Sequence, residues 1–185
     1  HIVGAVAQRL IALYPPALQS SLFPPNAAFA AACHDIGKVS PSFVEKLRYH
    51  CTSGMEHIPK QAISRELEKQ WGGHAGVSQA TAKALGAPEW IPEIVGQHHG
   101  FSPQLGGKQA DAEVFGGSAW QAQRAALVQE LQQRLGMSWP HIASAAQARL
   151  VAGLTSVADW IGSGRHFEDP TQPWENLIDT ALREA

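Results

Sequence analysis

The sequence predicts an all-α domain, folded as a bundle of roughly eight helices. Apolar residues recur at helical spacing along most of the chain, and no segment alternates polar and apolar residues for long enough to form a sheet. Glycines and prolines fall between these segments, where helices end or begin. We find no internal repeat and no low-complexity stretch. We expect helices over residues 2–14, 27–36, about 60–70, 74–85, 118–135 and 141–162, and further helices that begin near 41, 88 and 173.

The helix expected over 27–36 carries the most informative residues of the chain. Asn26 can cap its start, and Gly37 follows its end. Its sequence is apolar on all sides, which is typical of a central, buried helix. We therefore expect the last turn of this buried helix to carry His34 and Asp35.

The remaining boundaries rest on local helix signals. Pro15-Pro16 should end the first helix, since proline cannot continue one. Two glycines precede His74, which opens a helix, and the helix that begins near 88 runs into a pair of histidines. Ser118 with Gln121 reads as a capping box at the start of a long amphipathic helix.

The composition describes one globular domain over residues 1–185. The chain is 44% hydrophobic and 16% charged, which suits a folded core. No apolar run approaches about 18 residues and no basic leader opens the chain, so we expect neither a membrane span nor a signal peptide. Cys33 and Cys51 cannot define a disulfide scaffold, and we expect free thiols and a cytoplasmic location. The chain starts at His1 without a methionine, so we expect a fragment or a trimmed chain.

Charge and histidine content narrow the possible partners. The net charge of −2 argues against a protein that holds long duplex DNA by charge alone. It does not exclude a nuclease, because bound cations reverse the field at a site. Nine histidines in 185 residues are many, and metal binding is the usual reason.

The adjacent His34 and Asp35 offer one nitrogen ligand and one carboxylate that can bridge two cations. Two metal ions held close together clamp the attacking and the leaving oxygen of a phosphoryl transfer. The other ligands must come from elsewhere, because neighbours on a helix point about 100° apart. The candidates are His74, His98, His99 and Asp159, with His1 at the head of the first helix.

Two of these positions carry a specific physical argument. Asp159 lies in an otherwise apolar helix, and a buried carboxylate needs a cation or a strong donor. Lys38 follows Asp35 by one turn, so its amine can reach a phosphate oxygen and offset developing charge. Ser163 and Arg165, just after Asp159, are candidate phosphate contacts.

Each residue also has a structural explanation that stays open at this stage. An isolated His-Asp dipeptide is commonly chance, and Lys38 can be an ordinary surface lysine. His74 can be a solvent-facing residue at a helix start, and a histidine pair suits a helix C-terminus, where cations are favourable. Asp159 can pair with Arg149 or Arg165. The tryptophans mostly fall at apolar helical positions, so we expect them in the core, although Trp160 can instead border the site and stack on a base.

Taken together, the ordered motifs resemble the HD superfamily of metal-dependent phosphohydrolases. The similarity is closest to the HD nuclease domain of the CRISPR type I nuclease–helicase, and it spans residue 1 to about residue 163. The motifs that carry it are HIVGAVA from His1, His34-Asp35-Ile36-Gly37-Lys38, His74 with Ser78, His98-His99-Gly100, and Ser156-Val157-Ala158-Asp159-Trp160.

The resemblance implies an HD-domain helical bundle with two divalent transition-metal ions, of iron, manganese, nickel or cobalt. From this resemblance, together with the positions of these residues, we expect Asp35 and Lys38 to be catalytic, and Ser78, Ser163 and Arg165 to contact nucleic acid. The first metal would be held by His1, His34, Asp35 and Asp159, and the second by Asp35, His74, His98 and His99.

The resemblance also implies partners and a role. The family degrades single-stranded DNA that an RNA-guided CRISPR surveillance complex displaces, by endonuclease and exonuclease cleavage, in antiviral defence. A helicase domain feeds the strand; this chain has no G-x-x-x-x-G-K-[ST] motif, so the helicase would act in cis from another segment or in trans. Two other functions stay open, namely a nucleotide phosphohydrolase and a non-catalytic docking module.

Overall fold

The computed structural model describes residues 1–50, 65–169 and 171–185. This part of the chain is helical and contains no strand, which confirms the predicted all-α class. None of its helices is both long and apolar enough to cross a membrane. The α-helices are α1 (Ile2–Ala12), α2 (Pro16–Leu22), α3 (Ala27–Cys33), α4 (Pro41–His50), α5 (Arg65–Gln70), α6 (His74–Ala84), α7 (Ile91–Gly96), α8 (Gly117–Leu135), α9 (Ala145–Gly162) and α10 (Ile178–Glu184). Short 3-10 turns are η1 (Ile36–Lys38), η2 (Glu113–Phe115), η3 (Arg165–Phe167) and η4 (Trp174–Leu177).

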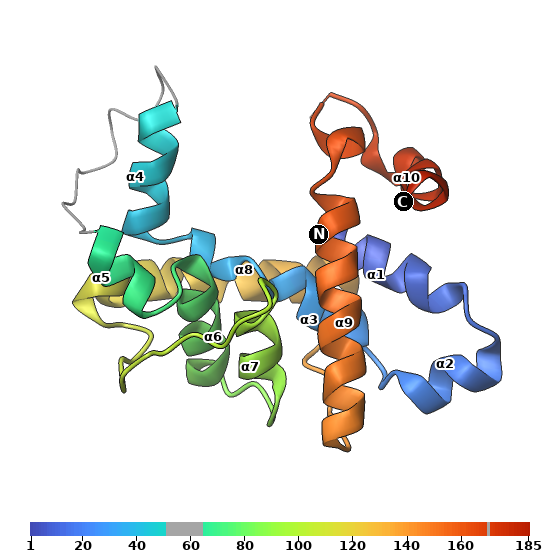
Figure 1. Ribbon diagram of the computed structural model, residues 1–185, viewed down its shortest axis with the longest axis horizontal. Coiled ribbons are helices and arrows are strands. Elements are labelled where there is room, and N and C mark those ends of the chain that lie inside the picture. Colours follow the sequence, from blue (N-terminus) through green and yellow to red (C-terminus); the bar gives the residue numbers. More distant parts are fainter. Residues whose placement is uncertain (51–64, 170) are drawn as a thin grey trace.

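Helix α3 lies at the centre of the main core, as its uniformly apolar sequence predicts. Phe29, Ala30 and Ala31 are fully buried. The helix packs against α1, α7, α8 and α9, and its small side chains let these helices approach closely. A Cβ added at Gly4 of α1 would lie 2.8 Å from the Cβ of Ala32. In Figure 1, α9 stands upright in the middle, with α4 to α7 on one side and α1 and α2 on the other.

A second, smaller core supports the other half of the domain. Trp71, at the end of α5, packs edge to face against Phe115 of η2, with ring centroids 5.4 Å apart. Val77 of α6 joins them, and all three side chains are fully buried. This core fixes the start of α6, the helix that His74 opens.

Several predicted boundaries need correction. The prolines at 15 and 16 end α1, but Pro16 also starts α2, because proline is well suited to the first turn of a helix. The helix expected to begin near 88 begins at Ile91, and the one expected over 141–162 begins at Ala145. Ser144 caps that last helix by accepting a hydrogen bond from the backbone N–H of Gln147 at 3.2 Å. The start of the helix expected over about 60–70 lies outside the described residues.

Two predicted N-caps are wrong. Asn26 adopts a left-handed conformation with φ of 65°, and its side chain caps nothing. Its amide donates instead to Ser138 Oγ at 3.3 Å. Helix α8 starts at Gly117 and not at Ser118, and Gln121 turns toward a neighbouring helix instead of closing a capping box.

The correction with the greatest consequence concerns the central helix. It ends at Cys33, three residues earlier than predicted, so His34 is its C-cap residue. Asp35 then begins the tight turn η1. Because this turn leaves the helical path, His34 and Asp35 are free to point toward the same place.

Candidate metal centre

The His34-Asp35 pair converges because it lies on the turn that follows α3. His34 Nε2 and Asp35 Oδ2 are 3.2 Å apart. On a regular helix these neighbours would diverge by about 100°, so the early end of α3 is what brings them together. His34 is buried and Asp35 is half-buried.

Asp35 lies at the middle of a group that we name the His–Asp cluster, made of His34, Asp35, His74, His98, His99 and Asp159. Its Oδ2 faces His34, while its Oδ1 lies 3.1 Å from His74 Nε2 and 3.5 Å from His98 Nε2. On the far side of His34, Asp159 Oδ1 from α9 is 3.1 Å from the same Nε2 atom. The two oxygens of Asp35 therefore face two different sets of side chains.

Three histidines form the second set. His74 opens α6, while His98 and His99 lie on the turn that follows α7. His74 Nε2 is 3.4 Å from His98 Nε2 and 3.0 Å from His99 Nε2, which is close enough for one cation to contact all three rings. Ser156 Oγ of α9 donates to the carbonyl of His98 at 3.3 Å and so ties this turn to α9.

The ring nitrogens of the buried histidines are oriented toward the centre. His34 Nδ1 lies 2.7 Å from the carbonyl of Ala31, and His98 Nδ1 lies 2.7 Å from the carbonyl of Val95. A carbonyl only accepts, so each Nδ1 carries a proton and donates, and each Nε2 is directed at the cluster, where it offers a lone pair whenever the ring is neutral. Metal-binding histidines are held by their second nitrogen in the same way.

This arrangement is electrostatically incomplete without a positive charge. His34 Nε2 and Asp35 Oδ1 are buried and have no hydrogen-bond partner among the described residues. A lone pair that faces two carboxylates is repelled unless a proton or a metal ion lies between them. Imidazole nitrogens and carboxylate oxygens are the ligands that divalent transition metals prefer, so these residues fit such ions.

The pKa values of the cluster residues are also consistent with a site that binds a positive charge. Burial alone lowers the pKa of the His34 imidazole, but its contacts with Asp159 and Asp35 outweigh burial and raise the pKa to about 9. Although burial raises the pKa of Asp35, the neighbouring His34 and His74 hold it well below its ordinary value. In contrast, burial lowers the pKa of His98 to about 4, which leaves that ring neutral and ready to bind a metal.

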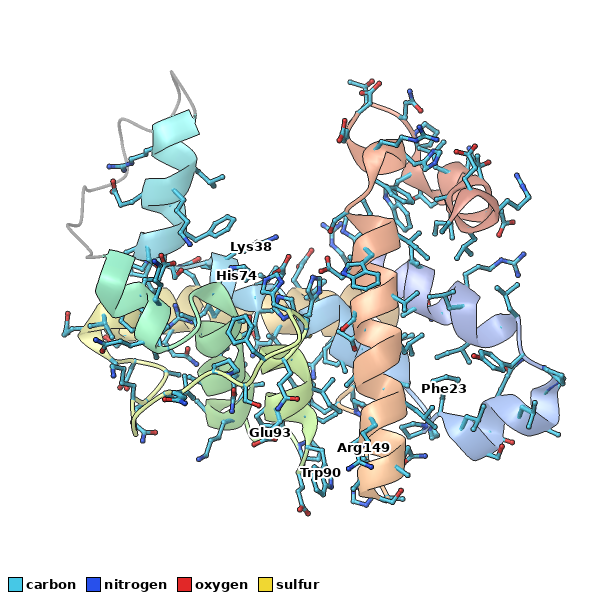
Figure 2. All side chains as sticks on the ribbon, viewed as in Figure 1. Phe23, Lys38, His74, Trp90, Glu93 and Arg149 are labelled. Carbon is cyan, nitrogen blue, oxygen red and sulfur yellow. The ribbon has the colours of Figure 1, made fainter. Side chains whose placement is uncertain are left out.

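Lys38 and the aromatic ring beneath it lie beside Asp35. The Lys38 ammonium contacts Asp35 Oδ2 and lies 5.5 Å from the centre of the Phe43 ring. Its side chain is 41% exposed, so the amine also reaches solvent. Figure 2 shows Lys38 and His74 close together, between α4 and the upright α9.

Glycine at position 37 allows α6 to approach the turn. A Cβ on Gly37 would lie 1.9 Å from the carbonyl oxygen of His74 and 2.6 Å from the backbone nitrogen of Ser78. The Gly37 N–H also donates to Ser78 Oγ at 2.8 Å. Ser78 is fully buried, so the structure contradicts its predicted role as a DNA contact; it supports the turn instead.

The structure also places the predicted site residues Ser163, Arg165 and His1, and each has a different partner. Ser163 Oγ donates to Asp159 Oδ1 at 2.8 Å and so orients that carboxylate. Arg165 donates to Glu184 at 2.8 Å, which links η3 to α10. The His1 ring packs edge to face on Trp174, with centroids 4.9 Å apart, and is in neither of the potential metal groups among the described residues. The start of α1 nevertheless lies beside the end of α9, because the two helices pack together and a Cβ added at Gly162 would lie 2.9 Å from Val3 Cγ2.

Two features of the site were not the first expectation from the sequence. Trp160, for which the core was expected first and the border of the site second, is 75% exposed beside Asp159. The helical pattern of α9 contained the signal, since Val151, Leu154 and Ala158 occupy the buried face and residue 160 lies off it. The orientation of Asp159 by Ser163 could also be read from their i, i+4 spacing on one helix.

The sequence matches the family model described as the Cas3 HD domain over residues 3–167. The chain belongs to the Cas3 HD family. The matched range covers most of the chain and confirms the resemblance drawn from the motifs. Neither a curated protein nor a solved structure matches the chain. Membership means a metal-dependent phosphohydrolase of the nuclease type that works on DNA in a CRISPR system, and HD domains bind divalent metals.

Replacing Gly37 tests how closely this Cas3 HD domain must pack around the turn. The Gly37→Ala change forces α6 away from η1 and should destabilise the domain by about 1–3 kcal/mol, as overpacking typically does. Gly153→Ala is the matched control, because no atom lies within 4 Å of its added Cβ. That change should be neutral or stabilise α9 by up to about 1 kcal/mol. Urea unfolding monitored by circular dichroism measures both, and equal stabilities for the two variants would contradict the close approach.

The raised pKa of His34 predicts proton release on metal binding. With its pKa near 9, the metal-free His34 is protonated at pH 7.5, and a metal ligand must be neutral. Filling the first site should therefore release about one proton at pH 7.5, and progressively less as the pH rises through 9. His98 adds none, because its pKa lies near 4.

Calorimetric titration with Mn²⁺ in buffers of different ionisation enthalpy measures this release. Asp159→Asn removes a carboxylate that raises the His34 pKa, so this variant should release fewer protons. A binding enthalpy that does not depend on the buffer would contradict the protonated state of metal-free His34.

Proposed function

We propose that this domain is a two-metal nuclease that hydrolyses the phosphodiester bonds of single-stranded DNA in type I CRISPR interference. The observation that carries the proposal is the position of Asp35, whose two carboxylate oxygens face two separate sets of ligand side chains. Two ions held close together clamp the attacking and the leaving oxygen of an in-line phosphoryl transfer, and Asp35 would contribute to holding both.

We assign the ligands as two sites that share Asp35. Bound divalent ions of iron, manganese, nickel or cobalt would supply Lewis acidity and an activated water. His1 is kept as a ligand because α1 begins beside the end of α9. The first site would use His1, His34, Asp35 and Asp159, and the second Asp35, His74, His98 and His99.

The residues of the chain would divide the work of catalysis. Asp35 stays ionised because its pKa is held low by His34 and His74 despite its burial, so it can hold positive charge at any physiological pH. Lys38 pairs with Asp35 and also reaches solvent, so its ammonium can move onto a non-bridging phosphate oxygen as charge develops there. Ser163 keeps Asp159 turned toward His34.

Exposed aromatic rings beside the cluster favour a substrate with unpaired bases. Trp160 is 75% exposed and follows Asp159 directly. Phe101 is 50% exposed, and its ring is nearly parallel to that of His99, at an interplanar angle of 17°. Bases of single-stranded nucleic acid stack on such rings without sequence preference, whereas bases paired in a duplex are not available to them.

The proposed role requires partners outside this chain. An RNA-guided surveillance complex would displace the DNA strand, and a helicase acting in cis or in trans would feed that strand to the metal centre. We place the domain in the cytoplasm, in antiviral defence, because that is where such a complex meets invading DNA.

Two substrates decide between the possible activities. The protein, loaded in turn with Mn²⁺, Ni²⁺, Co²⁺ and Fe²⁺, is incubated with circular single-stranded DNA and, separately, with a panel of deoxynucleotides and cyclic nucleotides. We expect the circles to be degraded and the nucleotides to persist. Hydrolysed nucleotides with intact circles would indicate a nucleotide phosphohydrolase, and inertness with every metal would indicate a non-catalytic docking module.

Asp35→Ala should abolish cleavage and leave the domain folded. Outer-shell partners of a metal contribute about 10- to 100-fold to activity, so a ligand shared by both ions should contribute more than about a hundredfold. Glu93→Ala is the matched control, since Glu93 is exposed at the start of α7, away from His74 (Figure 2). Cleavage rates and far-ultraviolet circular dichroism are compared, and residual turnover in folded Asp35→Ala protein would refute the bridging role.

Trp160→Ala should weaken binding to single-stranded DNA. Losing one stacked base removes about 1–3 kcal/mol, which raises Kd roughly 5- to 150-fold. Trp160→Phe should recover part of this affinity, and Leu150→Ala, an exposed residue on the same helix, should have no effect. Fluorescence anisotropy with a labelled oligonucleotide and Ca²⁺ in place of the active metal measures Kd, and an unchanged Kd for Trp160→Ala would exclude stacking at this ring.

A further inference from the structure

Arg124 of α8 is fully buried, and its guanidinium donates to four oxygen atoms. Its Nη1 donates to the carbonyl of Val39 at 2.8 Å and to that of Phe115 at 3.0 Å. Its Nη2 donates to the carbonyl of Ala110 at 2.7 Å, and its Nε donates to Gln121 Oε1 at 3.1 Å. Every partner is a neutral oxygen.

A buried charge of this kind requires an explanation. Burial lowers the pKa of Arg124 to about 10, so the side chain remains charged at neutral pH. Within the described ranges, no carboxylate pairs with it. A buried ion without a counter-ion is unfavourable unless its hydrogen bonds are complete. An apolar side chain of similar volume would stabilise the core at least as well. The geometry of the four contacts is therefore what this residue provides.

The Val39 contact reaches the turn that carries Asp35. Val39 is the C-cap residue of η1, and Gly37 within the turn already donates to Ser78 of α6. The turn is thus held at Gly37 from α6 and at Val39 from α8. Lys38 lies between these two points, one turn beyond Asp35.

The Gln121 contact reaches the helix that carries His74. Thr81 of α6 is fully buried, and its hydroxyl donates to Gln121 Oε1 at 3.3 Å. The same oxygen accepts from Arg124 Nε. Gln121 and Arg124 are one turn apart on α8. Through Gln121, α8 contacts α6, and through Arg124 it contacts the turn that carries Asp35.

We propose that Arg124, together with Gln121, is a positioning residue that sets the spacing between Asp35 and His74. Helix α8 contributes no side chain to the His–Asp cluster, yet it fixes the two elements whose ligands face each other at 3.1 Å. This inference rests on the proposed function only in that the spacing serves metal binding. It adds that two residues of α8, which are not among the proposed metal ligands, are needed to hold those ligands at the right spacing.

The experiment compares Arg124→Lys with Arg134→Lys. A lysine ammonium cannot reproduce the planar fork that serves four acceptors. Arg134 is the matched control, because it lies on the same helix, is 62% exposed and pairs only with Glu130 within the described structure. Both proteins are first checked for a cooperative thermal transition and native circular dichroism.

Two measurements distinguish an effect of Arg124 on the spacing of the His–Asp cluster from an effect on the stability of the fold. Imidazole NMR resonances of His74 and His98 in metal-free protein report the spacing, with exposed His141 as the internal reference. Mn²⁺ titration reports the consequence. We expect Arg124→Lys to shift the two cluster histidines and to weaken Mn²⁺ binding about 10- to 100-fold, as loss of outer-shell support typically does. Arg134→Lys should do neither.

The opposite results would overturn the inference. An Arg124→Lys protein that melts earlier but keeps wild-type resonances and Mn²⁺ affinity would show that Arg124 acts only on stability. If that variant does not fold, Gln121→Leu and Thr81→Val decide in the same assays, because the first removes the shared oxygen with both of its contacts and the second removes only the contact from α6. If wild-type protein binds no Mn²⁺, the proposed function fails, while the histidine resonances still decide the positioning role.

Discussion

The arrangement of this domain depends on one partly buried negative charge. Asp35 is held ionised where water is scarce, and the surrounding side chains all compensate that charge, either with a proton or by offering lone pairs around a cation. The requirement explains why the side chains around Asp35 come from several separate elements. One segment cannot surround a carboxylate, so the ends of α3, α6 and α7 and the last turns of α9 must meet.

The two hydrophobic cores hold the elements around Asp35 in place. Small residues along α3 let α1 and α9 approach it closely, and the second core around Trp71 and Phe115 fixes α6 from the other side. The metal centre thus lies where two cores join, and Arg124 connects the second of them to the Asp35 turn. Stability and site geometry are carried by the same contacts in this half of the molecule.

The sequence was sufficient for the fold class and for the chemistry of the cluster. His34, Asp35, His74, His98 and Asp159 stood out because a hydrophobic core gives no reason for polar groups at those positions, and the structure brings them together. Their assignment as metal ligands stays a prediction. Residues that act through the chemistry of their own side chains could be identified from the sequence.

What the sequence could not predict depends on contacts without a residue signature. Arg124 binds main-chain carbonyls, one of them 85 positions away, and any residue supplies a carbonyl. The exact end of α3 depends on the turn that follows it, so Asn26 and Gly37 marked the helix only approximately. The ring of His1 rests on Trp174, which lies outside every motif.

The missing side chain at Gly37 has one more consequence. Backbone meets backbone where η1 crosses α6, so the closest approach of these two elements is limited by main-chain atoms alone. A single hydrogen atom in place of a methyl group therefore permits the approach that brings Asp35 within 3.1 Å of His74.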